Sequence, residues 1–392
     1  FYKGNKNSPW WVVAIGMIGT TLSGVTFISV PGLVSTETKM TYFEVILGNF
    51  LGYIAIMYFL LPLYYKMNLT SIYGYIEQRF GKISYKTSAI LFLLSKLIGA
   101  GFRLFIVILV LQITVFDPLN LPFYLNAIIS VMLIWAYTIK GGIKSIIWTD
   151  MIQTFFLVFA VVFTIFSIGK ELNMNFTSMV SAICSNDQFV LFDFGNFWSN
   201  ENNFFKQFIS GAFITIVMTG LDQDMMQKNL SLKNIHEATK NFFSFSIALI
   251  PVNFIFLCLG VLFVIYINTK GISQQMNPDE IYPILATKYL PFSVSIFFIL
   301  GIIASAFSSA NSAMVAMTTS FMIDIYNGKN KSEHKLKKVR EITHTIVALC
   351  FIGIIILFHL FNDDSVVKTI FKFAGYTYGQ LLALFFVCLF TK

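Results

Sequence analysis

The sequence predicts an all-α, polytopic membrane protein with a core of ten helices. Of its 392 residues, 56% are hydrophobic and 12% are charged, whereas an average soluble domain is about 25% charged. The mean hydropathy is +0.74, and phenylalanine alone contributes 44 residues. These values exclude a disordered chain, a coiled coil and a water-soluble globular domain, because too few polar side chains remain to cover a surface.

The length of the apolar runs favours helices over a β-barrel. A helix needs about 20 apolar residues to cross a bilayer core about 30 Å thick, whereas barrel strands alternate apolar and polar residues. The runs here are continuous, as in Ser244–Ile267. We expect ten spans, near residues 11–35, 42–65, 84–115, 122–139, 147–169, 205–227, 241–267, 292–325, 341–361 and 366–391.

The basic residues predict the topology. If the N-terminal end is cytoplasmic and the spans alternate, 18 basic residues, Lys228 among them, lie on the cytoplasmic side and seven on the other. The remaining two, Lys96 and Arg103, lie inside the third span. This is the positive-inside pattern, so we expect a multi-pass protein of the plasma or inner membrane with both ends cytoplasmic. We interpret the basic loop 329–340 as a topological anchor rather than a site for nucleic acid or a regulatory partner.

Two spans contain signals of a broken helix. Glycines and hydroxylated residues fill the centre of the first span and predict an unwound stretch near 19–24, the alternative being close helix packing. The sixth span is interrupted at Thr219-Gly220. It lies five spans after the first, a spacing typical of inverted-repeat transporters. We therefore expect one transmembrane transport domain, 1–392, made of repeat one (about 9–170), an external loop (about 170–204) and repeat two (about 204–391).

The eighth span carries a serine face. Ser305, Ser308, Ser309 and Ser312 recur at i, i+3, i+4 and i+7, which places their hydroxyls on one side of a helix. Na⁺ takes neutral and carbonyl oxygens, so a serine face beside an unwound backbone is a candidate cation site. The alternative is a packing seam whose hydroxyls bond back to their own helix.

Ionisable residues inside spans are a further signal, because they are costly in a bilayer and mark functional sites. Arg103 is a candidate for contact with a solute or a gate, unless it snorkels or pairs with an acidic residue. Lys96 precedes it by seven residues on roughly the same face. Asp150 begins the fifth span, where an interfacial position is the alternative.

The sequence contains none of the common soluble-enzyme motifs. P-loop, dinucleotide-binding, nucleophile-elbow and zinc-protease patterns do not occur, and His236-Glu237 lacks a second histidine. Cys184 lies alone in the external loop, so no disulfide framework is implied. We expect no enzymatic activity, and we see no filter-like repeat that favours a channel.

Several blocks in a fixed order resemble the sodium/solute symporter family, whose members transport sugars, proline, sialic acid and pantothenate. They occupy residues 9–32, 69–81, 137–153, 221–230, 304–314 and 379–390. The first block looks most like the sialic acid transporter branch. The resemblance implies a leucine-transporter-type fold of two inverted five-helix repeats with broken first and sixth helices. The family's customary flanking helices lie outside this sequence, which is either the core alone or a compact member.

The resemblance also implies cation sites. The family's sodium site corresponds to the carbonyls of Gly19, Leu22 and Ser305 with the hydroxyls of Ser308 and Ser309. An optional second sodium site uses the aspartate of the Trp-Thr-Asp block. The matching residues here are Asp150, Asn311 and Ser312, where the asparagine departs from the family's hydroxyls.

Solute-binding positions follow from the same resemblance. They correspond to Thr21, Ser23, Thr26, Asn49, Asp222 and Gln223. The sialic acid branch places an arginine on the third span where this chain has Gly99, and Arg103 lies one turn away on the same face. The solute is therefore left open between a sugar, sialic acid, an amino acid and another carboxylate.

The expected function is sodium-coupled symport of a small organic solute by alternating access. Its partners are the solute, Na⁺ and the lipid bilayer, without nucleic acid, and we expect it to work as a monomer. The alternative is a transporter-like solute sensor with little flux.

Overall fold

The computed structural model describes residues 8–36, 38–69, 71–272, 276–326, 332–361, 376 and 378–388, and its regular elements in these residues are all helices. The α-helices are α1 (Trp10–Thr21), α2 (Gly24–Thr36), α3 (Tyr42–Ala55), α4 (Leu61–Lys66), α5 (Gly74–Leu111), α6 (Phe123–Glu171), α7 (Phe176–Cys184), α8 (Phe204–Thr215), α9 (Gln223–Asn229), α10 (Ile235–Lys270), α11 (Pro278–Ile284), α12 (Phe292–Ser320) and α13 (Glu333–Leu360). Short π-helical segments are η2 (Ile56–Leu60), η3 (Gln112–Phe116), η5 (Ile216–Gly220), η6 (Leu285–Tyr289) and η7 (Phe321–Ile325), and η4 (Asp117–Leu119) is a 3-10 turn. A further apolar helix covers Tyr378–Cys388.

The predicted spans correspond to these helices. Six of them are long and apolar enough to cross a bilayer, and two bent pairs each make one further span. Two shorter apolar helices, Phe123–Ile139 and Tyr378–Cys388, fall on the fourth and tenth predicted ranges. Of the tenth range, 366–391, the structure describes only 376 and 378–388. The all-helical fold class is thus confirmed.

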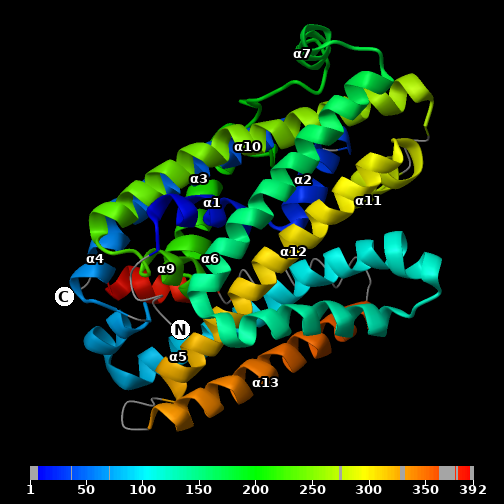
Figure 1. Cartoon of the computed structure of the whole chain (residues 1–392). Helices are drawn as coiled ribbons and strands as arrows, with labels where there is room; N and C mark the ends of the chain where they lie inside the picture. The colour runs from blue at the N-terminus through cyan, green and yellow to red at the C-terminus, as the bar shows by residue number, and fades with distance from the viewer. Residues whose placement is uncertain are drawn as a thin grey trace.

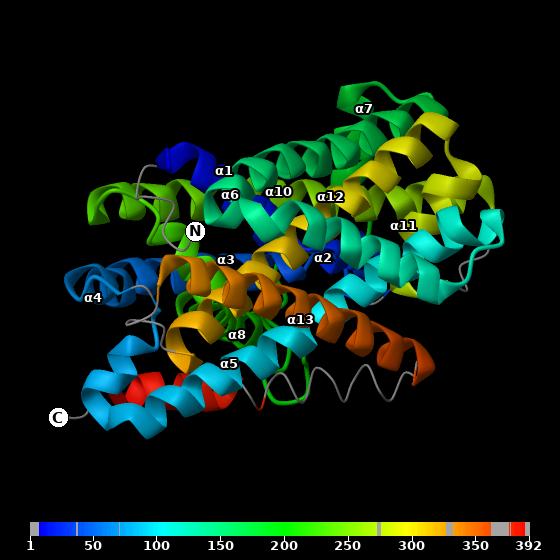
Figure 2. The ribbon, with the colours of Figure 1, turned by 60° about the horizontal axis from the view of Figure 1, so that its bottom comes forward.

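The first span, which is broken into α1 and α2, lies inside the helix bundle (Figure 1). Figure 1 shows α1 and α2 in the interior, between α10 on one side and α6 with α12 on the other. The long helix α6 has two arms, Phe123–Ile139 and Ile146–Glu171, and α12 packs along it. In Figure 2, α13 lies across α5 at the edge of the bundle. The site is therefore formed where α1, α5, α6, α9 and α12 approach one another.

The first span breaks between α1 and α2, which are bent by 59°. The amide of Ser23 donates to the carbonyl of Thr21 (3.0 Å) and not to that of Gly19, its partner in a continuous helix. The break therefore frees the Gly19 carbonyl from its helical donor. This confirms the predicted unwound stretch and narrows it to Leu22 and Ser23.

The sixth span breaks between η5 and α9, which are bent by 69°. Asp222 stands at the N-cap of α9, where its carboxylate accepts from the amide of Asp224 (2.8 Å). An acidic N-cap satisfies a free amide and complements the positive end of the helix. The predicted second break is confirmed, and it redirects the chain so that α9 points back into the bundle.

Glycines bring the broken helices close to their neighbours. A Cβ on Gly19 would lie 2.1 Å from Thr154 Oγ1 of α6, and one on Gly48 of α3 would lie 2.0 Å from the carbonyl of Phe208 in α8. A side chain at Gly48 would require the two backbones to separate, and one at Gly19 would require the Thr154 side chain to move. The close-packing alternative for the first span thus also holds at Gly19, where packing and unwinding occur together.

Candidate sodium and solute sites

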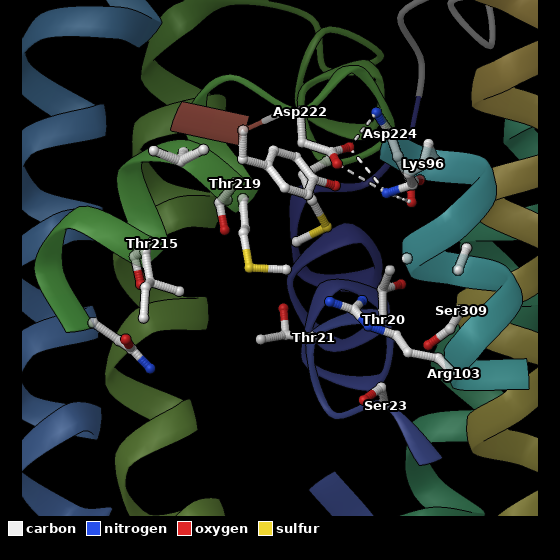
Figure 3. Close-up of a pocket in the computed structure, with 18 of the residues that line it drawn as sticks. Thr20, Thr21, Ser23, Lys96, Arg103, Thr215, Thr219, Asp222, Asp224 and Ser309 are labelled. Atoms are coloured by element: carbon white, nitrogen blue, oxygen red, sulfur yellow. Dashed lines mark hydrogen bonds and ion pairs between the residues drawn. The ribbon is translucent and has the colours of Figure 1, made fainter. Parts of the chain in front are cut away.

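A cavity of about 600 Å³ lies between the α1–α2 break, α5, the η5–α9 break and α12, a size that suits a small organic molecule. Figure 3 shows its lining residues. Those that the sequence singled out are Thr21, Ser23, Thr26, Asn49, Arg103, Asp222 and Ser309. The structure thus brings together, from five of the predicted spans, six residues predicted for solute binding and Ser309 of the predicted sodium site.

Arg103 projects from α5 into one end of this cavity (Figure 3). It is half-buried, and it makes no hydrogen bond or ion pair with the residues that the structure describes. The hydroxyls of Ser23 and Thr26 line the same cavity, 3.4 Å from each other. This end of the cavity therefore offers a positive charge and hydroxyl groups that are available to a ligand.

The other end of the cavity is closed by charges. Lys96 Nζ lies 3.0 Å from a carboxylate oxygen of Asp222 and 2.9 Å from one of Asp224. All three side chains are at least nine-tenths buried. This buried ion triad joins α5 to α9, so in this conformation Asp222 holds the helices together and also lines the cavity (Figure 3).

Two of the predicted solute residues take part in packing. Gln223 is fully buried, lies outside the residues that line the cavity, and accepts from the amide of Ile72 (3.0 Å). Asn49, with its amide nitrogen oriented toward acceptors, donates to the carbonyl of Gly211 (3.0 Å) while still lining the cavity. In this conformation Gln223 thus positions the segment before α5, and Asn49 joins α3 to α8.

The serine face of α12 divides into two sets. The hydroxyl oxygens of Ser305 and Ser309 are buried and have no hydrogen-bond partner among the described residues. A Cβ on Gly24 would lie 3.3 Å from Ser305 Oγ, so this oxygen faces the α1–α2 break. Ser308 instead donates to Asp150 Oδ1 (3.0 Å). Ser305 therefore presents its oxygen to the α1–α2 break, and Ser309 lines the cavity next to that break.

Asp150 is fully buried inside the helix bundle. It lies among hydroxyls from α1 and α12, accepting from Thr20 (3.2 Å) and Ser312 (3.3 Å) in addition to Ser308. The amide nitrogen of Asn311 lies 3.5 Å from Asp150 Oδ1, the oxygen that also accepts from Ser308. The residues predicted for a second cation site are thus assembled around one carboxylate.

The cation that faces Asp150 is Lys228. Its Nζ lies 2.6 Å from Asp150 Oδ2, and the two side chains are 1% and 0% exposed. Lys228 was expected in a loop at the membrane surface, but it is a buried residue of helix α9. The bend after η5 turns α9 inward, which carries this lysine into the bundle instead of toward the membrane surface.

Thr20 was not predicted from the sequence; it accepts a hydrogen bond from Lys228 and donates to Asp150. A signal for the ion pair was present, since a buried aspartate needs a cationic or hydroxyl partner. No local pattern identifies which of the 27 basic residues supplies it.

Comparison with known sequences gives consistent matches over the whole chain. The model of the sodium:solute symporter family matches residues 1–392. The sodium/sialic acid symporter SiaT of Proteus mirabilis is 26% identical, over 100% of this chain and 79% of the relative. NanT of Aliivibrio fischeri, also a sodium/sialic acid symporter, is 26% identical over 100% and 77%. The sodium/glucose cotransporter of Vibrio parahaemolyticus is 24% identical over 100% and 75%.

Solved structures give the same fold. A substrate-bound, outward-open Na⁺-coupled sialic acid symporter superposes with a TM-score of 0.86 at 22% identity, over 100% of this chain and 81% of that chain. A manganese transporter of Eremococcus coleocola reaches a TM-score of 0.54 at 12% identity, over 97% and 77%. The fold is thus of the leucine-transporter type, and the matches favour sodium-coupled solute import over solute sensing. The chain belongs to the sodium:solute symporter family.

Proposed function

We propose that this protein imports a small carboxylate-bearing solute of the sialic acid class together with Na⁺. The observation that carries the proposal is Arg103, a guanidinium in the solute cavity without an anionic partner among the described residues. Two relatives that span this whole chain are named sodium/sialic acid symporters, which supports the same class.

The chemistry of Arg103 favours an anion. A planar guanidinium binds a carboxylate through two parallel hydrogen bonds, and a charge held away from bulk water is stabilised when its counter-ion arrives. Thr21, Ser23 and Thr26 line the same cavity and offer hydroxyls to the polar groups of a sugar-like solute. A neutral solute would leave the arginine unpaired.

The sodium ion belongs, in this proposal, between the α1–α2 break and α12. Its ligands are the unpartnered hydroxyls of Ser305 and Ser309 with carbonyls of Gly19 and Leu22. The resemblance implied the carbonyl of Ser305 and the hydroxyl of Ser308 as well, but Ser308 here donates to Asp150. An ion there fixes the break in the shape that presents Thr21 and Ser23 to the solute. Because binding is reciprocal, solute then raises the affinity for Na⁺ by the same factor.

Alternating access follows from the two ends of the cavity. We place both chain ends and α9 on the cytoplasmic side, so that the ion triad of Lys96, Asp222 and Asp224 closes the inner path while solute enters from outside. Opening inward requires these pairs to separate. Because every site residue comes from one chain, the protein is expected to work as a monomer.

The test is a thermal-shift titration of the purified chain with N-acetylneuraminate in NaCl and in KCl. We expect the wild type to be stabilised by the ligand only when Na⁺ is present, since a ligand stabilises the state that it binds. Arg103→Met should weaken ligand binding at least tenfold while the stabilisation by Na⁺ alone persists. Arg103→Lys should retain an intermediate affinity, because it keeps the charge but loses the two-pronged geometry.

Lys233→Met, at an exposed position of the loop before α10, is the matched control and should behave like the wild type. Unchanged binding in Arg103→Met would disprove the assignment of the carboxylate partner. Equal stabilisation by a neutral hexose would contradict the proposed solute class.

A further inference from the structure

We infer that Lys228 is the built-in cation of the Asp150 cluster, so that this chain binds a single Na⁺ and not two. The inference rests on the proposed function for the first sodium site, at Ser305 and Ser309. It departs from what the family resemblance implies for Asp150, Asn311 and Ser312, where a second Na⁺ was expected.

The contacts around Asp150 leave its cation position filled. Lys228 Nζ lies 2.6 Å from Asp150 Oδ2 and also donates to Thr20 Oγ1, so one ammonium contacts both the carboxylate and the hydroxyl beside it. Ser312 and Ser308 donate to the same carboxylate. A sodium ion can bind Asp150 Oδ2 and Thr20 Oγ1 only if it displaces the Lys228 ammonium from them.

The charge balance points the same way. Among the described residues, six charged side chains lie around the cavity and the first break, three of them basic (Lys96, Arg103 and Lys228) and three acidic (Asp150, Asp222 and Asp224). Their formal charges cancel. A Na⁺ added to the neutral Lys228–Asp150 pair introduces an uncompensated charge where both side chains are almost fully buried, which costs several kcal/mol.

The hydrogen bonds of the serines of α12 also favour a single sodium site. Within the described residues, Ser305 and Ser309 have buried oxygens without partners, which are available to coordinate an ion. Ser308 and Ser312 are already bonded to Asp150. One face of the helix is therefore open to a mobile ion, and the neighbouring face is occupied by a cation of the protein itself.

This arrangement has a consequence for energy coupling. One Na⁺ transported together with one carboxylate solute has no net charge, and the charges of the cavity itself also cancel. The membrane potential then adds no driving force, and accumulation depends on the sodium concentration gradient alone. Two sodium ions per carboxylate would instead carry a net positive charge.

The experiment counts sodium ions. Equilibrium binding of ²²Na⁺ to the purified full chain, in choline buffer and without solute, gives the number of ions per protein. We expect one ion for the wild type and two for Lys228→Met, because the variant exposes the negative charge of Asp150 to the second ion. The matched control Lys233→Met, at an exposed loop position, should bind one.

The possible counts separate the two proposals. A rise from one to two supports both. A rise from none to one supports the role of Lys228 and contradicts the sodium site at Ser305 and Ser309. A count that does not change in Lys228→Met overturns the inference, as does a wild type that already binds two.

A second variant covers the case in which Lys228→Met does not fold. Asp150→Asn/Lys228→Met removes both charges and keeps the cluster neutral, so it should bind one ion like the wild type. A fall to none in this double variant would show that the wild-type ion uses Asp150, and the inference would be wrong.

Discussion

Two positively charged residues of α5 face the same cavity in opposite states. Lys96 and Arg103 are separated by seven residues, which is two helical turns or about 10 Å. Lys96 has two carboxylates within 3.0 Å, whereas Arg103 makes no ion pair within the described part of the chain. The difference indicates that the protein pairs its charges where helices have to stay together and leaves one unpaired at the end of the cavity where we propose that the solute binds.

The largest expected effect comes from breaking the paired end. Lys96→Met leaves Asp222 and Asp224 buried without their cation, and removing one partner of a buried pair costs about 3–5 kcal/mol. We expect a loss of this size in the free energy of unfolding, measured by denaturant titration in mixed micelles. Arg103→Met, on the same helix, should change the free energy of unfolding without ligand by less than about 1 kcal/mol, a surface-like value.

Equal losses in the two variants would contradict the comparison, because Arg103 would then have a structural partner of its own. Lys96→Met combined with Asp222→Asn and Asp224→Asn removes all three charges. This triple variant should recover part of the stability that Lys96→Met loses, since neutral groups are cheaper to bury than unpaired charges.

How far the sequence predicts this molecule depends on the range of each interaction. The breaks were predictable because their cause is local: glycines and hydroxylated residues interrupt an apolar run near residues 19–24 and at Thr219-Gly220. The serine face was predictable because its period is that of a helix. These signals depend on neighbours within a few residues.

The charge pairs were not predictable in the same way. Lys96 and Asp222 are 126 residues apart, and Asp150 and Lys228 are 78 apart. Which partners meet depends on the path that the chain takes after the 69° bend at η5, and a single sequence does not contain that angle. Gln223 illustrates the same limit, because α9 turns its side chain toward Ile72 and away from the cavity.

A smaller effect is expected in α12, where the unpartnered hydroxyls of Ser305 and Ser309 differ from the bonded hydroxyl of Ser308. Ser305→Ala/Ser309→Ala removes two hydroxyls that have no partner in the part of the chain that the structure describes. We therefore expect little change in the free energy of unfolding without Na⁺, but at least a tenfold weaker affinity for Na⁺ in ²²Na⁺ binding. Ser308→Ala removes a hydrogen bond to Asp150 and should cost about 1 kcal/mol of stability even without Na⁺.

The opposite pattern would reverse the roles of the two sets. If Ser305→Ala/Ser309→Ala kept the wild-type sodium affinity and lost stability, its hydroxyls would be packing groups of the helix. The alternative of a packing seam would then apply to this face of α12 rather than a sodium site.

The smallest expected effect concerns an exposed ion pair. It tests whether burial, and not pairing alone, determines the large loss of stability expected for Lys96→Met. Lys270 lies 3.6 Å from Glu171, but the two side chains are 41% and 37% exposed. Water and salt screen such a pair, so Lys270→Ala should cost less than about 1 kcal/mol, and the loss should shrink further at high KCl. The same unfolding titration measures it beside Lys96→Met. A cost equal to that of Lys96→Met would mean that burial does not determine how much an ion pair stabilises this protein. The lack of an ion pair at Arg103 would then not distinguish the proposed ligand-binding end of the cavity from the other end.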